Sequence, residues 1–363
     1  MYLQKLSLSN YRNYESLTLD CDPQTNIFIG ANGQGKTNLL EAVYYLCVAR
    51  SFREAPDKEL VRMNSDFFVA QGNGYSADET NVELLIRYAT QTGKKVFVNE
   101  LPQKNLSDIY GLMTAVVISP DDRRLVQGGP STRRRFIDIA ISQSNVPYLS
   151  TLQEYRRVVR QRNEALRTQQ ADIDLWNTPL IDLGCRIIRK RVEVVAVLKK
   201  EAQRIHANIS DKGENLEISY SPSFNFEANE SIESSFRDAL IRANSRERVK
   251  GMTEVGPHRD DISIEMNGVS LQSFGSQGQH KTAATALKLA EAHFLCHQGQ
   301  APPLLLLDDI FAEIDIARTW RLMEMIPEYG QTFITTAKEG DLGGFCQDVT
   351  RFRVSDGVVA PYS

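Results

Sequence analysis

Cysteine, long apolar runs and an excess of charge of either sign are all scarce in this chain of 363 residues. The five cysteines are scattered, odd in number and without a CxxC pair, which argues against a structural zinc site and predicts reduced thiols in the cytosol. No apolar run reaches the length of a membrane-spanning helix, and the first ten residues lack the apolar core of a signal peptide. We therefore expect a soluble, cytoplasmic protein with no membrane partner.

The formal net charge is only -4, so the charge of the whole chain does not indicate nucleic-acid binding. Any such binding must come from a local basic surface. With 42% hydrophobic and 24% charged residues, the composition is that of a globular protein long enough for two domains.

One stretch, residues 30–37, fits the phosphate-binding pattern G-x-x-x-x-G-K-[ST]. Residues 26–29 before it are typical of a short buried strand, and residues 38–48 after it of a helix with one apolar face. In this setting, backbone N–H groups and the helix N-terminus can surround a phosphate. Lys36 is the candidate catalytic contact to the β- and γ-phosphates, and the Thr37 hydroxyl is a candidate Mg²⁺ ligand. The predicted nucleotide-binding residues of the loop are Gly30, Ala31, Asn32, Gly33, Gln34, Gly35, Lys36 and Thr37.

A second pattern is the apolar run Leu304–Leu307, which is typical of a strand buried on both faces of a parallel sheet. Two carboxylates, Asp308 and Asp309, follow at the carboxyl end, where such sheets bind ligands. Asp308 is the second candidate Mg²⁺ ligand, and Asp309 is the candidate catalytic residue that orients or deprotonates an attacking water. The alternative is a buried strand that simply ends at charged residues.

Ser276, Gly278 and Gln279 stand at the start of a predicted helix, Gln279–Cys296. Small polar residues and glycines there predict an anion-binding helix end, although a plain turn and cap would have the same sequence. Ser276 follows Gly30 by 246 residues, whereas Asp308 follows Ser276 by only 32. A large, mostly helical insert therefore separates two halves of one predicted nucleotide site.

The insert contains two long predicted helices, 146–169 and 180–209, in which arginine and lysine recur. Most such runs are solvated helix faces, and the alternative is a surface that contacts phosphate groups. Acidic residues among the basic ones weaken that alternative. The predicted domains are an ATP-binding α/β lobe of residues 1–119 and 250–363, and a helical lobe of residues 120–249.

Taken together, these residues resemble the RecF family of bacterial DNA-repair ATPases, which are relatives of the SMC and ABC ATPase heads. The resemblance covers nearly the whole chain, and Asn10–Tyr14 and Gly256–Asp261, in this order and setting, are specific to RecF. It implies an α/β fold, an ABC/SMC-like ATPase head with a mixed-sheet lobe carrying the phosphate loop and a mostly helical lobe. Besides the ATP motifs, it rests on Asn10–Tyr14, Ser119-Pro120, Arg133–Phe136 with Asp138, and Gly256–Asp261.

The resemblance also implies a homodimer, in which two subunits enclose ATP between the phosphate loop of one and the Ser276 signature of the other. ATP and Mg²⁺ are the implied cofactors. The residues that it assigns to them are Lys36, Thr37, Asp308, Asp309, Arg12, Asn13, Ser276, Gly278 and Gln279, with Asp315 at the dimer seam.

The implied function is ATP-dependent DNA binding in recombinational repair and replication-gap processing. The ATP-bound dimer would clamp single-stranded, duplex, gapped or junction DNA, and slow ATP hydrolysis would release it. The implied partners are RecR and RecO, with which the protein would help RecA replace single-strand-binding protein and contribute to SOS induction.

Three departures from the superfamily pattern bear on hydrolysis. Asp309 stands where many members have glutamate, so we expect a weak, DNA-stimulated ATPase that acts as a switch. No glutamine follows Ser119, which leaves Asp121 or Asp122 as its replacement, and Thr336 is the candidate phosphate sensor in place of a histidine.

Two other functions stay open at this point. ATP could merely close the dimer of a non-enzymatic scaffold, which Asp309 and the missing histidine favour. The third possibility is an ABC transporter ATPase subunit, but the spacing of 246 residues between Gly30 and Ser276 is much longer than that class has.

Overall fold

The computed structural model describes residues 1–170, 172–210, 213–226, 231–298, 301–310, 321, 324–338, 340 and 349–362. The domain boundaries expected at residues 119 and 250 stay predictions. A search of the described helices finds no segment both long and apolar enough to span a bilayer. The chain divides into two compact units, the first comprising Met1–Asp122, Arg204–Lys212 and Ala284–Ser363, the second Arg123–Gln203 and Gly213–Ala283.

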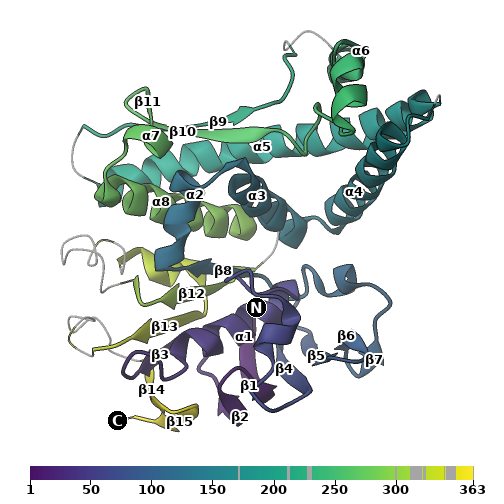
Figure 1. Ribbon diagram of the computed structural model, residues 1–363. Helices are drawn as coiled ribbons and strands as arrows, with labels where there is room; N and C mark the ends of the chain where they lie inside the picture. Colours follow the sequence, from purple (N-terminus) through teal and green to yellow (C-terminus); the bar gives the residue numbers. More distant parts are fainter. Residues whose placement is uncertain are drawn as a thin grey trace. The chain divides into compact units, whose positions relative to one another are not determined.

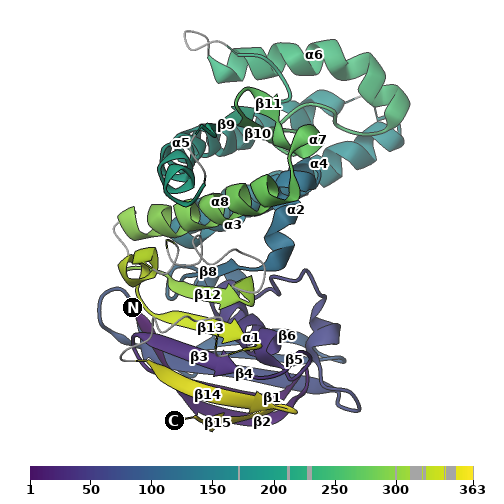
Figure 2. The ribbon, with the colours of Figure 1, turned by 90° about the vertical axis from the view of Figure 1, so that its left-hand side faces the viewer.

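A six-stranded sheet in the first unit carries the phosphate loop after β3 (Figures 1 and 2). Its strands run parallel except for the edge strand β15, so the sheet is mixed, as predicted. All residues of β8 and β12 are buried, as their unbroken apolar runs predict. In spatial order the strands are β15 (Val358–Pro361), β14 (Thr350–Ser355), β3 (Thr25–Ile29), β13 (Thr332–Thr336), β12 (Leu304–Asp308) and β8 (Ala115–Ile118).

The other N-terminal strands form a separate antiparallel sheet rather than joining the phosphate-loop sheet. Buried and exposed residues alternate along these strands, but such a pattern does not say which strands pair with one another. Helix α1 (Lys36–Val48) packs against strands of both sheets, which explains why nearly all of its residues are buried. The strands of this second sheet are, in order, β2 (Tyr14–Asp20), β1 (Tyr2–Tyr11), β4 (Phe67–Tyr75), β5 (Asn81–Ala89), β6 (Gly93–Val98) and β7 (Leu101–Pro102).

The second unit is mostly helical, with a three-stranded sheet in the order β11, β10, β9 (Figure 1). Asn267 and Gly268 form the tight turn between β10 and β11, both with positive φ, as the sequence predicts. The elements are α2 (Arg123–Gln127), α3 (Pro130–Ser144), α4 (Val146–Arg167), α5 (Asn177–Ile209), β9 (Leu216–Ser221), α6 (Ile232–Lys250), β10 (Asp261–Met266), β11 (Val269–Ser270), α7 (Leu271–Phe274) and α8 (Gln277–His297), of which α5 and α8 end in the first unit. Short 3₁₀ turns are η1 (Asp57–Leu60), η2 (Leu106–Ile109), η3 (Pro120–Asp122), η4 (Ile173–Trp176) and η6 (Ile326–Tyr329).

The segment Gly256–Asp261, for which the sequence offered no physical role, holds the second unit together. Gly256 has φ 125°, and a Cβ there would lie 2.4 Å from the Tyr155 hydroxyl, so only glycine fits. The carbonyl of Pro257 accepts a hydrogen bond of 2.6 Å from the buried guanidinium of Arg191. The segment is thereby fixed to both α4 and α5.

Two aspartates at the end of this segment extend the network. Asp260 is fully buried, and its carboxylate accepts hydrogen bonds from the Ser223 backbone N–H at 2.7 Å and from the Tyr220 hydroxyl. Asp261 accepts two bonds of 2.8 Å from the Arg133 guanidinium of α3. Because an unpaired buried charge is costly, these bonds stabilise the buried Asp260 carboxylate and the buried Arg133 guanidinium.

His258 in the same segment predicts a pH dependence of stability. Its ring lies 2.8 Å from the Tyr155 hydroxyl and 3.1 Å from the Thr253 carbonyl, and burial lowers its pKa from 6.5 to about 4. Between pH 6.5 and 4 the unfolded chain therefore binds a proton at His258 that the folded chain does not. The free energy of unfolding is thus unaffected by this group above pH 6.5 and decreases as the pH falls from 6.5 to 4. The shift corresponds to about 3 kcal/mol.

In urea unfolding at pH 7 and pH 4, the wild type should accordingly lose about 3 kcal/mol more stability than His258→Asn. His297→Asn, at an exposed histidine, is the matched control and should behave as the wild type. Equal pH-dependent losses in the wild type and His258→Asn would contradict the assignment.

Candidate nucleotide site

The phosphate loop connects β3 to α1, and two of its glycines, Gly30 and Gly35, are required by close neighbours. Gly35 has φ 112°, and a Cβ there would lie 2.4 Å from the Asn13 amide nitrogen. At Gly30, a Cβ would lie 2.2 Å from the carbonyl oxygen of Val354 in β14. Real Cβ atoms do not approach so closely, so these positions exclude side chains and keep the loop backbone against its supports.

The ammonium group of Lys36 is held by the loop itself. Its Nζ donates hydrogen bonds to the carbonyl oxygens of Gly30 at 2.6 Å and Ala31 at 3.0 Å. Burial lowers the pKa of Lys36, while the carboxylates of Asp309 and Asp308 act in the opposite direction. The site therefore places a positive charge at the start of α1, where an anion also meets the helix N-terminus.

Thr37 and Asp308, the two predicted metal ligands, lie together. The Thr37 hydroxyl donates to Asp308 Oδ1 at 2.9 Å, and the Thr335 hydroxyl donates to the same oxygen at 2.9 Å. Burial raises the pKa of Asp308, which these two hydrogen bonds oppose. Among the described residues no group of three or more His, Cys, Asp or Glu side chains could hold a metal. One carboxylate and one hydroxyl, completed by phosphate oxygens and water, fit Mg²⁺, which seldom binds in all-protein cages.

Asp309 lies beside this pair in an unusual backbone conformation. Its φ is 50°, a left-handed value that is uncommon outside glycine, asparagine and aspartate. Its backbone N–H donates to the Thr335 hydroxyl at 3.0 Å, which fixes the turn after β12. The Thr335 hydroxyl therefore ties Asp308 and Asp309 to the neighbouring strand.

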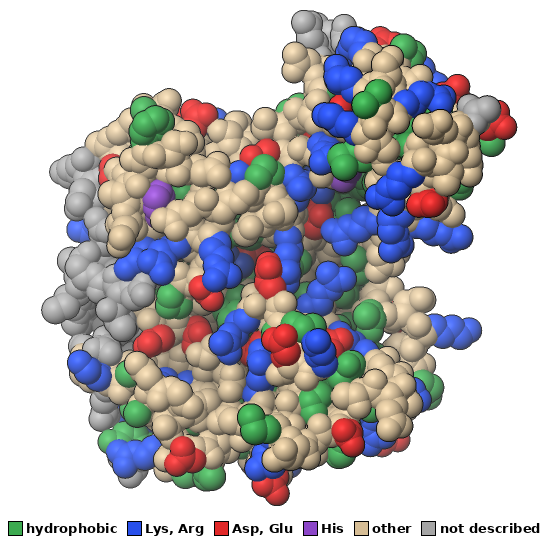
Figure 3. All heavy atoms as spheres, viewed as in Figure 1, with side chains coloured by type: hydrophobic (Ala, Val, Ile, Leu, Met, Phe, Trp, Pro, Cys, Tyr) green, Lys and Arg blue, Asp and Glu red, His purple; other side chains and the backbone are tan. Residues whose placement is uncertain are grey.

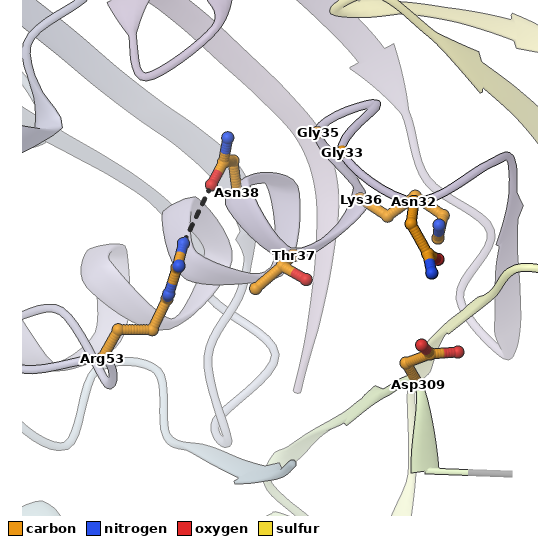
Figure 4. A pocket seen from close by; sticks show the side chains of 8 residues that line it. All are labelled: Asn32, Gly33, Gly35, Lys36, Thr37, Asn38, Arg53 and Asp309. Atoms are coloured by element: carbon orange, nitrogen blue, oxygen red, sulfur yellow. Dashed lines mark hydrogen bonds between the residues drawn. The ribbon is translucent and has the colours of Figure 1, made fainter. Parts of the chain in front are cut away.

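Lys36, Thr37 and Asp309 line a cavity of about 430 Å³ (Figure 4). Lys36, Asn32 and Asp309 lie on one side of it, and Asn38 and Arg53 on the other. Arg53 also lines the cavity, although it belongs to no motif and follows α1 in a loop, so that no sequence pattern indicates it. Its guanidinium donates to Asn38 at 3.3 Å and gives the cavity a second cation. The lining residues are Asn32, Gly33, Gly35, Lys36, Thr37, Asn38, Arg53 and Asp309.

Arg12, Asn13 and Gln34 do not line this cavity. Arg12 forms a bidentate pair with the buried carboxylate of Glu41, at 2.8 and 2.9 Å. Asn13 donates to the carbonyl of Gln34 at 3.1 Å and accepts from Asn38 at 2.8 Å, so it supports the loop from behind. Direct contacts of these three side chains with a nucleotide stay predictions.

The predicted signature residues come together at the start of α8, in the second unit. The Ser276 hydroxyl accepts from the Gln279 N–H at 3.2 Å, and the Gln279 side chain accepts from the Ser276 N–H at 3.0 Å. This reciprocal pair is a capping box. Ser276 and Gly278 are exposed, as is the preceding side chain of Phe274 at 78%. The role of this helix start at a nucleotide stays a prediction.

The residues predicted to replace the superfamily's glutamine and histidine are engaged locally. Asp122 accepts a 2.6 Å hydrogen bond from the Ser119 N–H, and burial raises its pKa to about 6. Thr336 donates to a carbonyl two residues further along the chain, whereas its neighbour Thr335 contacts Asp308. Asp315, expected at a dimer seam, lies outside the described residues.

Comparison with known proteins gives relatives over the full chain. The RecF/RecN/SMC N terminal domain family matches residues 2–358. The DNA replication and repair protein RecF of Streptococcus pneumoniae (strain CGSP14) is 38% identical over 364 residues, which are 99% of this chain and 99% of the relative. The solved recombination mediator protein RecF-ATP in the RecFOR pathway is 30% identical with a TM-score of 0.92, covering 100% of this chain and 98% of that one. The Smc head bound to the C-winged helix domain of ScpA, at 16% identity and a TM-score of 0.59 over 100% of this chain and 98% of that one, shares the fold alone.

Proposed function

The chain belongs to the RecF family of RecF/RecN/SMC ATPase heads, and from this we propose that it is an ATP-dependent DNA-binding protein of DNA replication and repair. The observation that carries the proposal is the cavity lined by Lys36, Thr37 and Asp309, in which Thr37 is hydrogen-bonded to Asp308. A RecF relative of 30% identity was solved with ATP, according to its name, which supports ATP as the ligand here.

Each residue of the site has a task in binding and hydrolysing ATP. Lys36 binds the β- and γ-phosphates, whose oxygens replace the two loop carbonyls as acceptors of its hydrogen bonds. Thr37 and Asp308 hold Mg²⁺, which neutralises charge on the phosphates when bound. Asp309 accepts a proton from the attacking water or orients it. Arg53, on the other side of the cavity, adds a second positive charge facing the phosphates.

The Ser276 signature completes the site in trans, in an ATP-dependent homodimer. The N-terminal end of α8 is already formed in the single chain, because a capping box holds it. It is also exposed, so a second copy can reach it. Backbone N–H groups and the N-terminal end of α8 suit the γ-phosphate of the partner's ATP. A site assembled from two chains makes turnover per subunit depend on protein concentration.

Mixing two inactive variants tests this arrangement. Lys36→Met removes the phosphate loop's cation, and Ser276→Arg blocks the signature, so each homodimer has two defective sites. A mixed dimer has one site with both defects and one with neither. We expect ATP turnover to appear on mixing, approaching a quarter of the wild-type rate, because about half of the dimers then hold one of two sites intact. If turnover stays at the level of the separate variants, the site is completed in cis and the trans proposal is wrong.

The remaining parts of the proposal concern partners. The solved RecF relative is named as a recombination mediator of the RecFOR pathway, which supports RecR and RecO as partners and RecA loading at DNA gaps or junctions as the outcome. A role in SOS induction and a cytoplasmic location belong to the same proposal. A second candidate function, a scaffold in which ATP only closes the dimer, is favoured by the short carboxylate at Asp309.

A further inference from the structure

The arginine-rich helices of the second unit differ in how their charges are balanced. On α5, several basic side chains face carboxylates: Arg186 lies 2.9 Å from Asp182, and Lys190 lies 2.7 Å from Glu193. Each such pair cancels its own charge. Further α5 pairs of this kind are Arg189–Glu233 and Lys199–Glu217. These paired residues therefore form a solvated face of little net charge, the commoner of the two alternatives for a charge run.

Helix α4 is different. Arg156, Arg157, Arg160 and Arg167 are all exposed, and the helix contains no lysine. In the described part of the chain no carboxylate lies within ion-pair distance of Arg157 or Arg160. Arg156 is half-exposed and lies 3.3 Å from Asp138, and Arg167 lies 3.5 Å from Glu164, an exposed residue on the same side of α4. Because Arg157 and Arg160 stay unpaired among the described residues, this side of α4 keeps a net positive charge.

The geometry of an α-helix places these four arginines on one side. At 100° per residue they fall within a third of the circumference, and Arg156 and Arg160 are about 6 Å apart along the axis. The opposite side of α4 is buried, where Arg162 pairs with Glu247 of α6 at 2.6 Å. The four exposed arginines, here called the α4 arginine face, thus point away from α6. In the space-filling view, Lys and Arg side chains gather along α4 (Figure 3).

We propose that the α4 arginine face binds the sugar–phosphate backbone of DNA. The inference rests on the proposed DNA-binding function and assigns it a surface. A guanidinium can bind a phosphate through two parallel hydrogen bonds, and arginine is more weakly hydrated than lysine. Contacts of this kind position the nucleic acid without reading its sequence. Arg157 and Arg160 contribute most, because they give up no ion pair on binding.

The test is the salt dependence of DNA binding, measured with ATP and Mg²⁺ present. Each phosphate contact adds about 0.9 to the slope of log affinity against log salt concentration. The double variant Arg157→Gln/Arg160→Gln should therefore lower the slope by about 1.8, so that its affinity falls about tenfold less than that of the wild type between 50 and 200 mM salt. The matched control Arg186→Gln/Lys190→Gln, on the ion-paired α5, should keep the wild-type slope.

The possible results distinguish a wrong assignment to α4 from a wrong DNA-binding function. ATP-dependent dimerisation and turnover without DNA should be unchanged in both double variants, because Arg157, Arg160 and Arg186 are exposed and Lys190 is partly exposed. A wild type without salt-sensitive binding would reject the DNA-binding function itself. If the wild-type slope is steep, two results would overturn the assignment to α4. One is an unchanged slope in the α4 double variant, and the other is an equal decrease of the slope in the α5 control. An unchanged DNA slope with lost binding of an acidic partner protein would assign the face to that protein instead.

Discussion

Lys36→Met is expected to abolish detectable ATP turnover and to weaken ATP binding by about 100-fold, as measured by nucleotide titration and phosphate release. The lysine Nζ is fixed by two loop carbonyls and needs little reorganisation to meet a phosphate. A hydrogen bond to a charged group contributes about 1.5–3 kcal/mol, and the side chain is expected to make such bonds to two phosphates. Hydrolysis loses more than binding, because charge develops on the transferred phosphoryl group.

The control for this prediction is Lys58→Met, which removes an exposed lysine from the same unit and should leave binding and turnover unchanged. Lys36→Arg tests geometry, since it keeps the charge but not the compact ammonium that fits between the Gly30 and Ala31 carbonyls. If Lys36→Met folds correctly and binds ATP with wild-type affinity, the predicted role of Lys36 in phosphate binding is wrong.

Asp309→Asn is expected to lower the turnover number by 10²- to 10⁴-fold while ATP binding is kept, so that closed dimers accumulate. Asparagine is the suitable replacement because it tolerates the left-handed backbone at this position, where φ is 50°. The backbone N–H bond to Thr335 is also preserved. Turnover, nucleotide affinity and dimer fraction by light scattering should be measured on one preparation.

This variant also decides between a switch and a scaffold. If hydrolysis releases DNA, Asp309→Asn cells should fail in repair of gapped DNA, whereas Asp20→Asn, at an exposed aspartate of the same unit, should be normal. Full repair by a variant that binds ATP and dimerises but does not hydrolyse would favour the scaffold.

The fold and the core of the site could be predicted because their signals are local. The phosphate loop is a continuous stretch between a strand and a helix, so its spacing determines the backbone that surrounds a phosphate. The leucine run before Asp308 likewise requires a strand buried on both faces, and the comparisons confirm the ATPase head fold.

Other parts could not be predicted, because they depend on residues far apart in the sequence. Thr335 reaches Asp308 only because β13 pairs with β12, and Arg53 reaches the cavity only through the loop after α1. The residues Gly256–Asp261 by themselves do not indicate which side chains of α3, α4 and α5 they contact.

The sequence by itself determined that this chain forms an ATPase head with a phosphate loop, because contiguous motifs carry their own geometry. Only the tertiary structure decided which arginines are structural. Arg162 and Arg191 are almost completely buried and held by Glu247 and Asp138, whereas Arg157 on the same helix as Arg162 is exposed. Charge along a sequence is visible, but burial and pairing are not, since both depend on partners brought near by folding.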